Sequence, residues 1–417
     1  MKMLKNLVRL LFICVIVTSL AGCWDQKELD QKAYVIAIGL DEAEQEGKIK
    51  VSYLIANPEV GSQQTGGGTN EPTQEIVSLV ADDFISSRNT ANAIIAREIS
   101  YDLLQVIIVS EDFAENPNFI RWIYSAAKDR EIKRSAKLIV SKEKAEKFVL
   151  TNKPQIETRP HKFFELMIER GQETGMIPDT DLNSYYSITE SDADLFLAIY
   201  ATTEKDESQM KVSDDDLMAG EVHAEGTTRN AQFIGSAVFK EGMMIGKITG
   251  EETRISSLLD NTWNTEDIMT NFQDPFNETY RISARVSQKR QNRYTFKNKY
   301  GRPEILIEVP LFVEILSDPS MINYAKNKRK VMELQRFITK KIEDKMNEYI
   351  TRTQEEFKGD TFHLSVPIRR HFKTLPEFRD FDWMKSYPDA VVKVKVNIRF
   401  GEFGRQTKLP KLKEVRD

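Results

Sequence analysis

Residues 305–315 read ILIEVPLFVEI, and this stretch decides the fold class of the C-terminal part of the chain. Apolar residues occupy every second position from Ile305 to Ile315, which predicts a long strand with one face in a core. Glu308 and Pro310 fall on the other face. Because proline has no N–H to give to a neighbouring strand, we expect a sheet edge or a bulge at position 310.

The segment that follows this strand predicts the longest helix of the chain. Over 328–354, apolar residues such as Leu334, Ile338 and Met346 recur at steps of three and four. Lysines and arginines between 328 and 345 leave much of the remaining helix surface basic, which we interpret as a solvated face. The alternative is a contact with anionic lipid headgroups or an acidic partner. An alternating strand over 391–398 completes a predicted α+β domain, 261–417.

The first part of the chain alternates between predicted strands and predicted helices, which favours helices packed on a sheet. The predicted strands are 33–40, 49–56, 103–109, 136–141, 195–201, 231–239 and 244–248, and the predicted helices are 81–98, 118–128, 142–150 and 251–259. The composition of 61–74 indicates a mobile loop. A proline-bounded segment, 154–160, marks a boundary, so we expect an N-terminal α/β domain, 23–153, and a middle domain, 154–260. The predicted fold class is therefore mixed α/β, or α+β, in three domains, each with a β-sheet packed by helices.

The N-terminus predicts a lipoprotein signal peptide over 1–22. Three basic residues precede an apolar run, Leu10 to Leu20, which is shorter than the ~20 residues needed to span a bilayer. Leu-Ala-Gly-Cys follows at 20–23 and resembles a bacterial lipobox, with cleavage between Gly22 and Cys23 and lipidation of Cys23. A plain secretory signal or a short buried helix is the alternative interpretation. Two or more acyl chains would hold the mature chain stably on a membrane.

Composition excludes several classes of protein. The chain has 417 residues, 40% hydrophobic and 29% charged, which is typical of folded globular domains. Its net charge is −5 and the signal carries no acidic residue, so the mature part is acidic and lacks the basic footprint of a nucleic-acid binder. The two cysteines are Cys14, in the signal, and Cys23. A mature chain that keeps Cys23 alone can form neither an internal disulfide nor a thiolate metal site.

No catalytic, cofactor or metal motif stands out. The four histidines, at 161, 223, 363 and 371, lack the spacing of a helical zinc pair, so we interpret them as surface or structural residues. Asp214-Asp215-Asp216 does not match a calcium loop and is interpreted as a solvated acidic loop. Phosphate-binding and nucleophile-elbow motifs are absent from the sequence. We therefore expect a protein without enzymatic activity, and a surface hydrolase is a remote third possibility.

Several blocks together resemble the Ger(x)C family, the C-subunit lipoproteins of bacterial spore germinant receptors. The blocks, in chain order, are Cys23 to Leu29, Tyr34 to Asp41, Arg130 to Lys133 with Lys144-Ala145, Gly235 to Phe239 with Gly246, Gly250 to Thr253, Asp360 to Phe362, the surroundings of Trp383, and the strand from Val392 to Ile398. The resemblance covers nearly the whole mature chain. The stretch 61–74 and His363 after Asp360-Thr361-Phe362 depart from the pattern or match it only approximately.

The resemblance implies a non-catalytic, lipid-anchored subunit on the outer face of the spore inner membrane. It would act with a multi-pass A-type subunit and a transporter-like B-type subunit in a response to small nutrients. It also implies three mixed α/β domains, and only Cys23 receives a defined role. The alternative function is a substrate-binding lipoprotein that delivers a small ligand to a membrane transporter. That class usually has two doubly wound lobes, whereas few regular βα units are predicted after residue 150.

Overall fold

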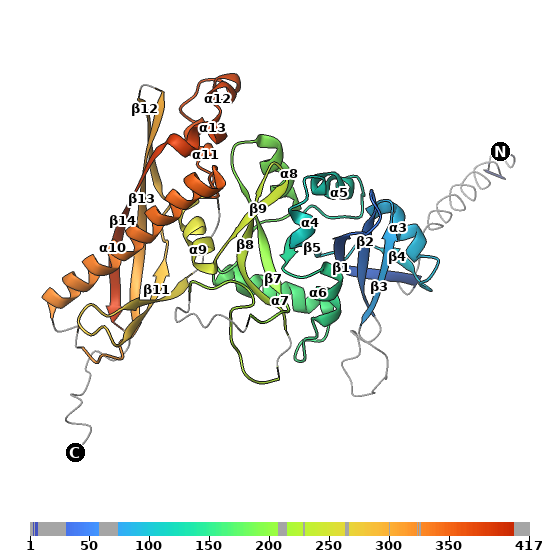
Figure 1. The fold of residues 1–417 in the computed structure, drawn as a ribbon, viewed down its shortest axis with the longest axis horizontal. Helices are drawn as coiled ribbons and strands as arrows, with labels where there is room; N and C mark the ends of the chain where they lie inside the picture. Colours follow the sequence, from blue (N-terminus) through green and yellow to red (C-terminus); the bar gives the residue numbers. More distant parts are fainter. Residues whose placement is uncertain are drawn as a thin grey trace, which may run out of the picture.

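The computed structural model describes residues 3, 5–6, 31–57, 74–206, 215–227, 230–262, 267–299, 301–322, 324 and 327–403. Gly22, Cys23 and the glycine-rich stretch 61–73 lie outside these residues. The described chain forms two β-sheets with helices packed on them, which confirms the predicted mixed α/β class. The first sheet and the second sheet lie side by side along the longest axis of the molecule (Figure 1). No helix in the described ranges is long and apolar enough to cross a membrane.

The first sheet has nine strands, in the order β3-β2-β1-β5-β6-β7-β8-β9, with β4 beside β1. Its strands are β1 (Lys32–Glu42), β2 (Ile49–Ala56), β3 (Gln74–Ala81), β4 (Glu98–Ser100), β5 (Val106–Ser110), β6 (Lys137–Ser141), β7 (Phe196–Thr202), β8 (Gln232–Lys240) and β9 (Met243–Ile248). The central strands β1, β5, β6 and β7 are parallel, and antiparallel strands flank them on both sides. Helices on both faces explain why β5 is a continuous apolar run, because every residue of it is buried.

The helices that cover this sheet come from the connections between its strands. They are α3 (Phe84–Ala91), α4 (Glu111–Ala114), α5 (Phe119–Ala126), α6 (Ala145–Thr151), α7 (Pro160–Glu173) and α8 (Leu182–Ser191). α5 buries Phe119 and Ile123 in the core cluster on one side of the sheet, whereas α6 and α7 bury Phe148 and Phe163 in the cluster on the other side. The sheet is therefore a layer between two separate apolar cores.

The second sheet carries the alternation that the sequence predicts. Its strands are β10 (Ile268–Gln273), β11 (Arg281–Ser287), β12 (Arg293–Lys299), β13 (Arg302–Ser317) and β14 (Val391–Phe403). Buried and less buried residues alternate along β13 from Pro303 to Ile315. The long helix α10 (Lys328–Arg352) packs against β14 and buries Leu334, Ile338 and Met346, as the sequence predicts. A π-helical turn, η3 (Thr353–Phe357), continues it.

Pro310 lies within the sheet and not at its edge, so the prediction of an edge is wrong in that form. β14 runs parallel to β13 from Glu304 to Ile315 and pairs Asn397 with Pro310. Two further strands pair with different parts of β13: β12 with residues 302–308 and β11 with residues 312–317. Position 310 falls between these two pairings, which is where a missing N–H interrupts neither ladder.

Four helical segments complete the fold, and the sequence predicted only the first of them. They are α9 (Gly250–Leu259), α11 (Ser365–Arg369), α12 (Leu375–Phe381) and α13 (Trp383–Ser386), with a 3-10 turn, η4 (Tyr387–Asp389). Thr249 and Glu252 form a capping box at the start of α9, with Thr249 N–H donating to Glu252 at 3.0 Å. This local signal supports the helix that the sequence predicts at 251–259.

The predicted helix over 81–98 is wrong in extent. Asp83 caps α3 by accepting from the N–H groups of Ile85 and Ser86, and the helix ends at Ala91. A turn and β4 follow it, because residues 98–100 pair with the start of β1. The strands β3, β10 and β12 and the helix α8 were missed, since tertiary pairing and packing define them more than local sequence does.

The boundary predicted between 153 and 154 falls between α6 and α7, and the first sheet has strands on both sides of it. The boundary predicted at 260–261 falls directly after α9, which ends at Leu259. It precedes β10, the first strand of the second sheet, which begins at Ile268. The division into three domains stays a prediction, which limited proteolysis of the two boundaries would test.

We predict a large loss of stability for Gly235→Ala. Gly235 has φ +88°, and a Cβ there would lie 2.6 Å from the carbonyl oxygen of Ile248 on β9. Backbone strain and overlap with a main-chain atom together should lower the free energy of unfolding by about 3 kcal/mol or more. Gly47→Ala is the matched control, because φ is +75° but nothing lies within 4 Å, and about 1 kcal/mol is expected. Urea unfolding measures both, and equal losses would contradict the argument.

Candidate functional site: the junction of the two sheets

Sequence blocks that lie far apart along the chain meet where the two sheets join. The junction is formed by the start of β7, by α9, by the end of α10 and by the loop 358–365 with α13. α9 lies between the two sheets (Figure 1). Thr253, Ser256 and Ser257 of α9 are buried, so their contacts form in a region of low dielectric constant.

Asp360 is the centre of this junction. Its side chain is fully buried and accepts from the N–H groups of Phe362 at 3.2 Å and Leu364 at 3.1 Å, and from the indole N–H of Trp383 at 2.6 Å. Burial and the neighbouring carboxylate of Asp194 raise the pKa of Asp360 well above its usual range. One side chain therefore organises the loop that follows α10 and fixes α13 against it.

The first sheet meets this loop at the residues that precede β7. The N–H of Leu195 donates to the carbonyl oxygen of Asp360 at 2.7 Å. Asp194 accepts from both the N–H and the hydroxyl of Ser365. Burial raises the pKa of Asp194. Gly359 allows the loop to pack closely against Leu195 and Met384, because a Cβ at position 359 would lie 2.8 Å from side-chain atoms of both residues.

His363 forms a buried ion pair with the end of α9. Its Nδ1 lies 2.6 Å from the carboxylate of Asp260, and the side chain is 12% exposed. Burial would lower the pKa of His363, but the hydrogen bond and the negative charge of Asp260 outweigh it and raise the pKa to about 9. The imidazole is therefore protonated at neutral pH. The interpretation of His363 as a structural histidine is confirmed.

Two groups of buried hydroxyls lie in the same junction. The Ser256 hydroxyl on α9 lies 2.9 Å from the carbonyl oxygen of Thr361, and the Thr361 hydroxyl lies 2.5 Å from that of Tyr349 on α10. The hydroxyls of Thr353 and Tyr387 lie 2.6 Å apart. The first group joins α9, the loop 358–365 and α10, and the second joins η3 to η4.

Arg352, at the end of α10, links the second sheet to the edge of the first. Its guanidinium donates to Glu252 of the capping box at 2.6 and 2.7 Å and to the carbonyl oxygen of Lys247 on β9 at 3.1 Å. Hydrogen bonds to Glu356 and Glu252, against some burial, raise the pKa of Arg352. Gly246, also on β9, allows the ring of Phe357 to pack closely. A Cβ at position 246 would lie only 2.8 Å from that ring.

A polar cleft of about 550 Å³ lies next to the junction and is lined by the end of α7, by α9 and by β10 and β11. Its charged side chains already have ion-pair partners, Glu173 with Arg170, Arg254 with Asp215, and Asp267 with Lys289. The Asp215 carboxylate lies 2.9 Å from Arg254 and is buried. The interpretation of Asp214-Asp215-Asp216 as a solvated loop is therefore wrong for Asp215, because Asp215 is buried in an ion pair with Arg254, which lies far away in the sequence.

The structure places the other predicted residues as follows. Cys23 and Gly22, the predicted lipidation and cleavage residues, lie outside the described residues. His223 and His371 are exposed and His161 is half-buried. In the ranges that the structure describes, no three His, Cys, Asp or Glu side chains are grouped to hold a metal ion.

The sequence singled out Asp360 only within the block Asp360 to Phe362, and it did not single out Asp194 or Asp260. The available signal was an aspartate before a loop that contains a histidine, which is too common to indicate a buried site by itself. The contacts of Asp260 with His363 and of Asp194 with Ser365 join residues 103 and 171 positions apart, so only the folded chain brings them together.

Comparisons with known proteins match both halves of the chain. Residues 25–202 match the model of the spore germination protein N-terminal domain, and residues 234–404 match the model described as spore germination B3/GerAC like, C-terminal. Spore germination protein B3 of Bacillus subtilis is 20% identical over 93% of this chain and 95% of its own length. Spore germination protein KC of the same organism is 27% identical, but the alignment covers 34% of each chain.

A solved structure has the same fold. The crystal structure of the GerBC protein superimposes with a TM-score of 0.53 at 16% sequence identity, covering 90% of this chain and 99% of that chain. The match covers 90% of this chain, so the shared fold extends over both sheets.

Proposed function

Because the chain belongs to the family of GerAC-like spore germination proteins, we propose that it is a lipid-anchored, non-catalytic subunit of a nutrient-sensing germinant receptor. The observation that carries this proposal is the match of both family models, in order, along most of the chain. The names of the relatives, spore germination proteins B3 and KC, support the same process.

The proposed mechanism is scaffolding. Acyl chains on Cys23 would hold the protein on the outer face of the spore inner membrane, in the presence of A-type and B-type membrane subunits. Confinement to a surface raises the effective concentration of each partner for the others. The buried junction supports this role, because a protein that transmits force or position between partners needs its two sheets to move as one body. We propose no cofactor, metal or nucleic-acid partner.

The lipobox supplies the direct test. We expect Cys23→Ala to fold normally but to be lost from the spore inner-membrane fraction, and the nutrient response to fall to the level of a strain that lacks the protein. Cys14→Ala is the matched control, because Cys14 lies in the segment that would be removed, and it should leave retention and response unchanged. Membrane fractionation and loss of spore refractility after nutrient addition measure the two effects. A soluble Cys23→Ala protein with a full response would contradict the proposal.

The alternative, a lipoprotein that delivers a small ligand to a transporter, is tested by calorimetric titration of the isolated protein with amino acids and sugars. The polar cleft beside the junction is the place where such a ligand would bind. Asp267 and Lys289 of this cleft pair with each other, and Glu173 and Arg254 pair with Arg170 and Asp215 outside it, which favours the scaffolding role. Tight binding of one nutrient to the isolated protein would favour the alternative.

A further inference from the structure

The turn between α3 and β4 exposes apolar side chains. It has the sequence Ala93-Ile94-Ile95-Ala96, and three of these four residues are exposed, with Ile94 at 68%. Ile95 packs against the first core cluster. Leu103, after β4, is 48% exposed. Ala93, Ile94 and Ala96 together form an exposed apolar tip on this turn.

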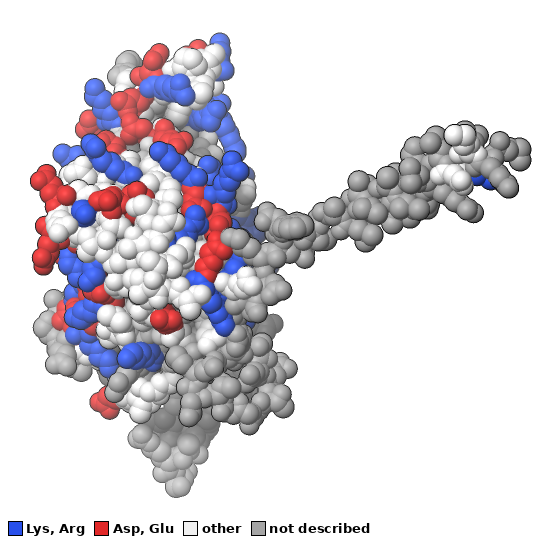
Figure 2. All heavy atoms as spheres, turned by 90° about the vertical axis from the view of Figure 1, so that its right-hand side faces the viewer, with Lys and Arg blue, Asp and Glu red and all other residues white. Residues whose placement is uncertain are grey.

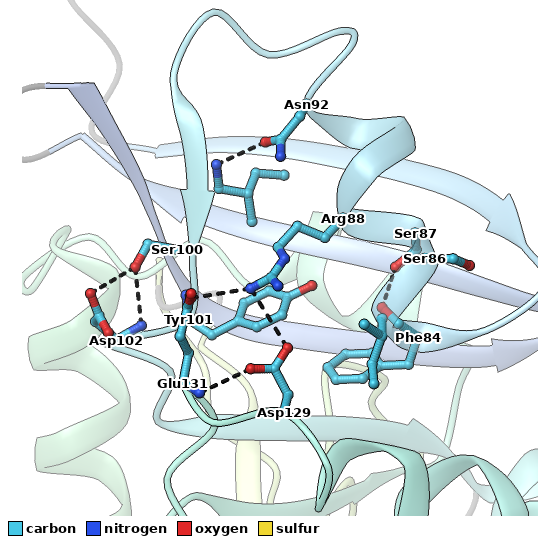
Figure 3. A network of polar contacts seen from close by, with 12 residues as sticks. Phe84, Ser86, Ser87, Arg88, Asn92, Ser100, Tyr101, Asp102, Asp129 and Glu131 are labelled. Atoms are coloured by element: carbon cyan, nitrogen blue, oxygen red, sulfur yellow. Dashed lines mark hydrogen bonds and ion pairs between the residues drawn. The ribbon is translucent and has the colours of Figure 1, made fainter. Parts of the chain in front are cut away.

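A polar network holds this turn in place (Figure 3). Asn92 accepts from the N–H of Ile99 at 2.9 Å and so closes the turn. Arg88 lies over the ring of Tyr101 and forms ion pairs with Glu131 at 3.2 Å and Asp129 at 3.6 Å. The N–H of Tyr101 also donates to Glu131 at 3.0 Å. The base of the turn is therefore fixed, and its apolar tip is presented from a defined support.

The turn lies beside the start of the folded chain. Lys32, the first residue of β1, pairs with Glu98 of β4 and forms an ion pair of 2.8 Å with Asp102. Lys32 lies nine positions after Cys23, and an extended chain of that length reaches at most about 30 Å. α3 and β4 occupy the end of the molecule opposite to the second sheet (Figure 1). Viewed from that end, Figure 2 shows an area of uncharged side chains bordered by charged ones.

We propose that the tip at Ile94 enters the outer leaflet of the phospholipid bilayer and fixes the orientation of the protein next to its anchor. The proposal rests on the lipid anchor of the proposed function. A bilayer fits this surface better than a protein partner does, because a stable protein interface needs about 800 Å² on each side, whereas this tip offers a few small apolar residues. In the proposed arrangement the acyl chains supply the membrane affinity, so the tip needs to add only a small contact that sets the orientation.

The experiment uses single cysteines as probes of depth. In the acylated mature chain no thiol remains free, so Ile94→Cys and Leu103→Cys each introduce one site for an environment-sensitive fluorophore. Leu375→Cys is the matched control, because Leu375 is 40% exposed and belongs to the second-sheet end. The full lipidated protein is reconstituted into vesicles of phosphatidylethanolamine and phosphatidylglycerol that contain nitroxide-labelled lipid.

We expect a blue-shifted emission and at least threefold stronger nitroxide quenching at position 94 than at position 375, with position 103 between them. Equal and weak quenching at 94 and 375, on vesicles that retain the protein, would overturn this inference and leave the anchor intact. A parent protein that takes up the fluorophore at Cys23 and does not float with the vesicles would overturn the anchor and, with it, this inference. Unchanged thermal melting of each variant shows that the label reports on a folded protein.

Discussion

Asp360→Ala is expected to lower the free energy of unfolding by about 3 to 5 kcal/mol. The substitution removes the acceptor of three buried donors, the N–H groups of Phe362 and Leu364 and the indole N–H of Trp383. Each donor left without a partner in a region closed to water costs about 1 to 3 kcal/mol, and the loss of the buried carboxylate itself offsets part of that cost. Denaturant unfolding followed by tryptophan fluorescence measures the change.

Two matched variants separate the network from the charge. Trp383→Phe removes one donor and leaves the two backbone contacts, so a loss of about 1 to 2 kcal/mol is expected. Asp380→Ala changes an exposed aspartate on the neighbouring helix α12 and should cost less than about 0.5 kcal/mol. A loss for Asp360→Ala no larger than that for Asp380→Ala would show that Asp360 does not hold the junction.

The protein is expected to lose stability between pH 6.5 and 9. The pKa of His363 is about 9 in the folded protein and 6.5 without its surroundings, so the folded state binds the proton more tightly. The stabilisation is fully present below pH 6.5 and is lost as the pH rises through about 9, and it amounts to about 3 kcal/mol. The raised pKa values of Asp194 and Asp360 act with the same sign, because their ionisation in the junction also opposes folding as the pH rises.

His363→Asn isolates the contribution of the imidazole. Asparagine tolerates the positive φ of 52° at this position and can donate to Asp260, but it does not titrate. Thermal melting at pH 6.5 and pH 9 should therefore show a much larger decrease for the natural protein than for the variant. Parallel decreases in both proteins would mean that the pH dependence arises elsewhere.

The sequence predicted the helices and strands whose pattern of apolar residues follows directly from which of their residues are buried. β13 alternates, β5 is apolar from Val106 to Val109, and apolar residues of α10 recur at steps of three and four, so each was placed correctly within a few residues. The sequence was wrong in the extent of α3, which begins after the Asp83 cap at Phe84 and ends at Ala91. It also missed β3 and β12, because their strand character depends on the neighbours with which they pair.

The sequence by itself determined the acidic composition, the lipobox prediction at Cys23 and the ordered blocks that resemble the family, since all of these are local or additive properties of the chain. Only the tertiary structure decided what several of those blocks do together. Asp360, Thr361, Glu252 and Trp383 look unremarkable one by one, yet they converge on one buried junction with Asp194 and His363. Burial strengthens the contacts between these polar groups and shifts their pKa values. Burial is a property of the folded chain.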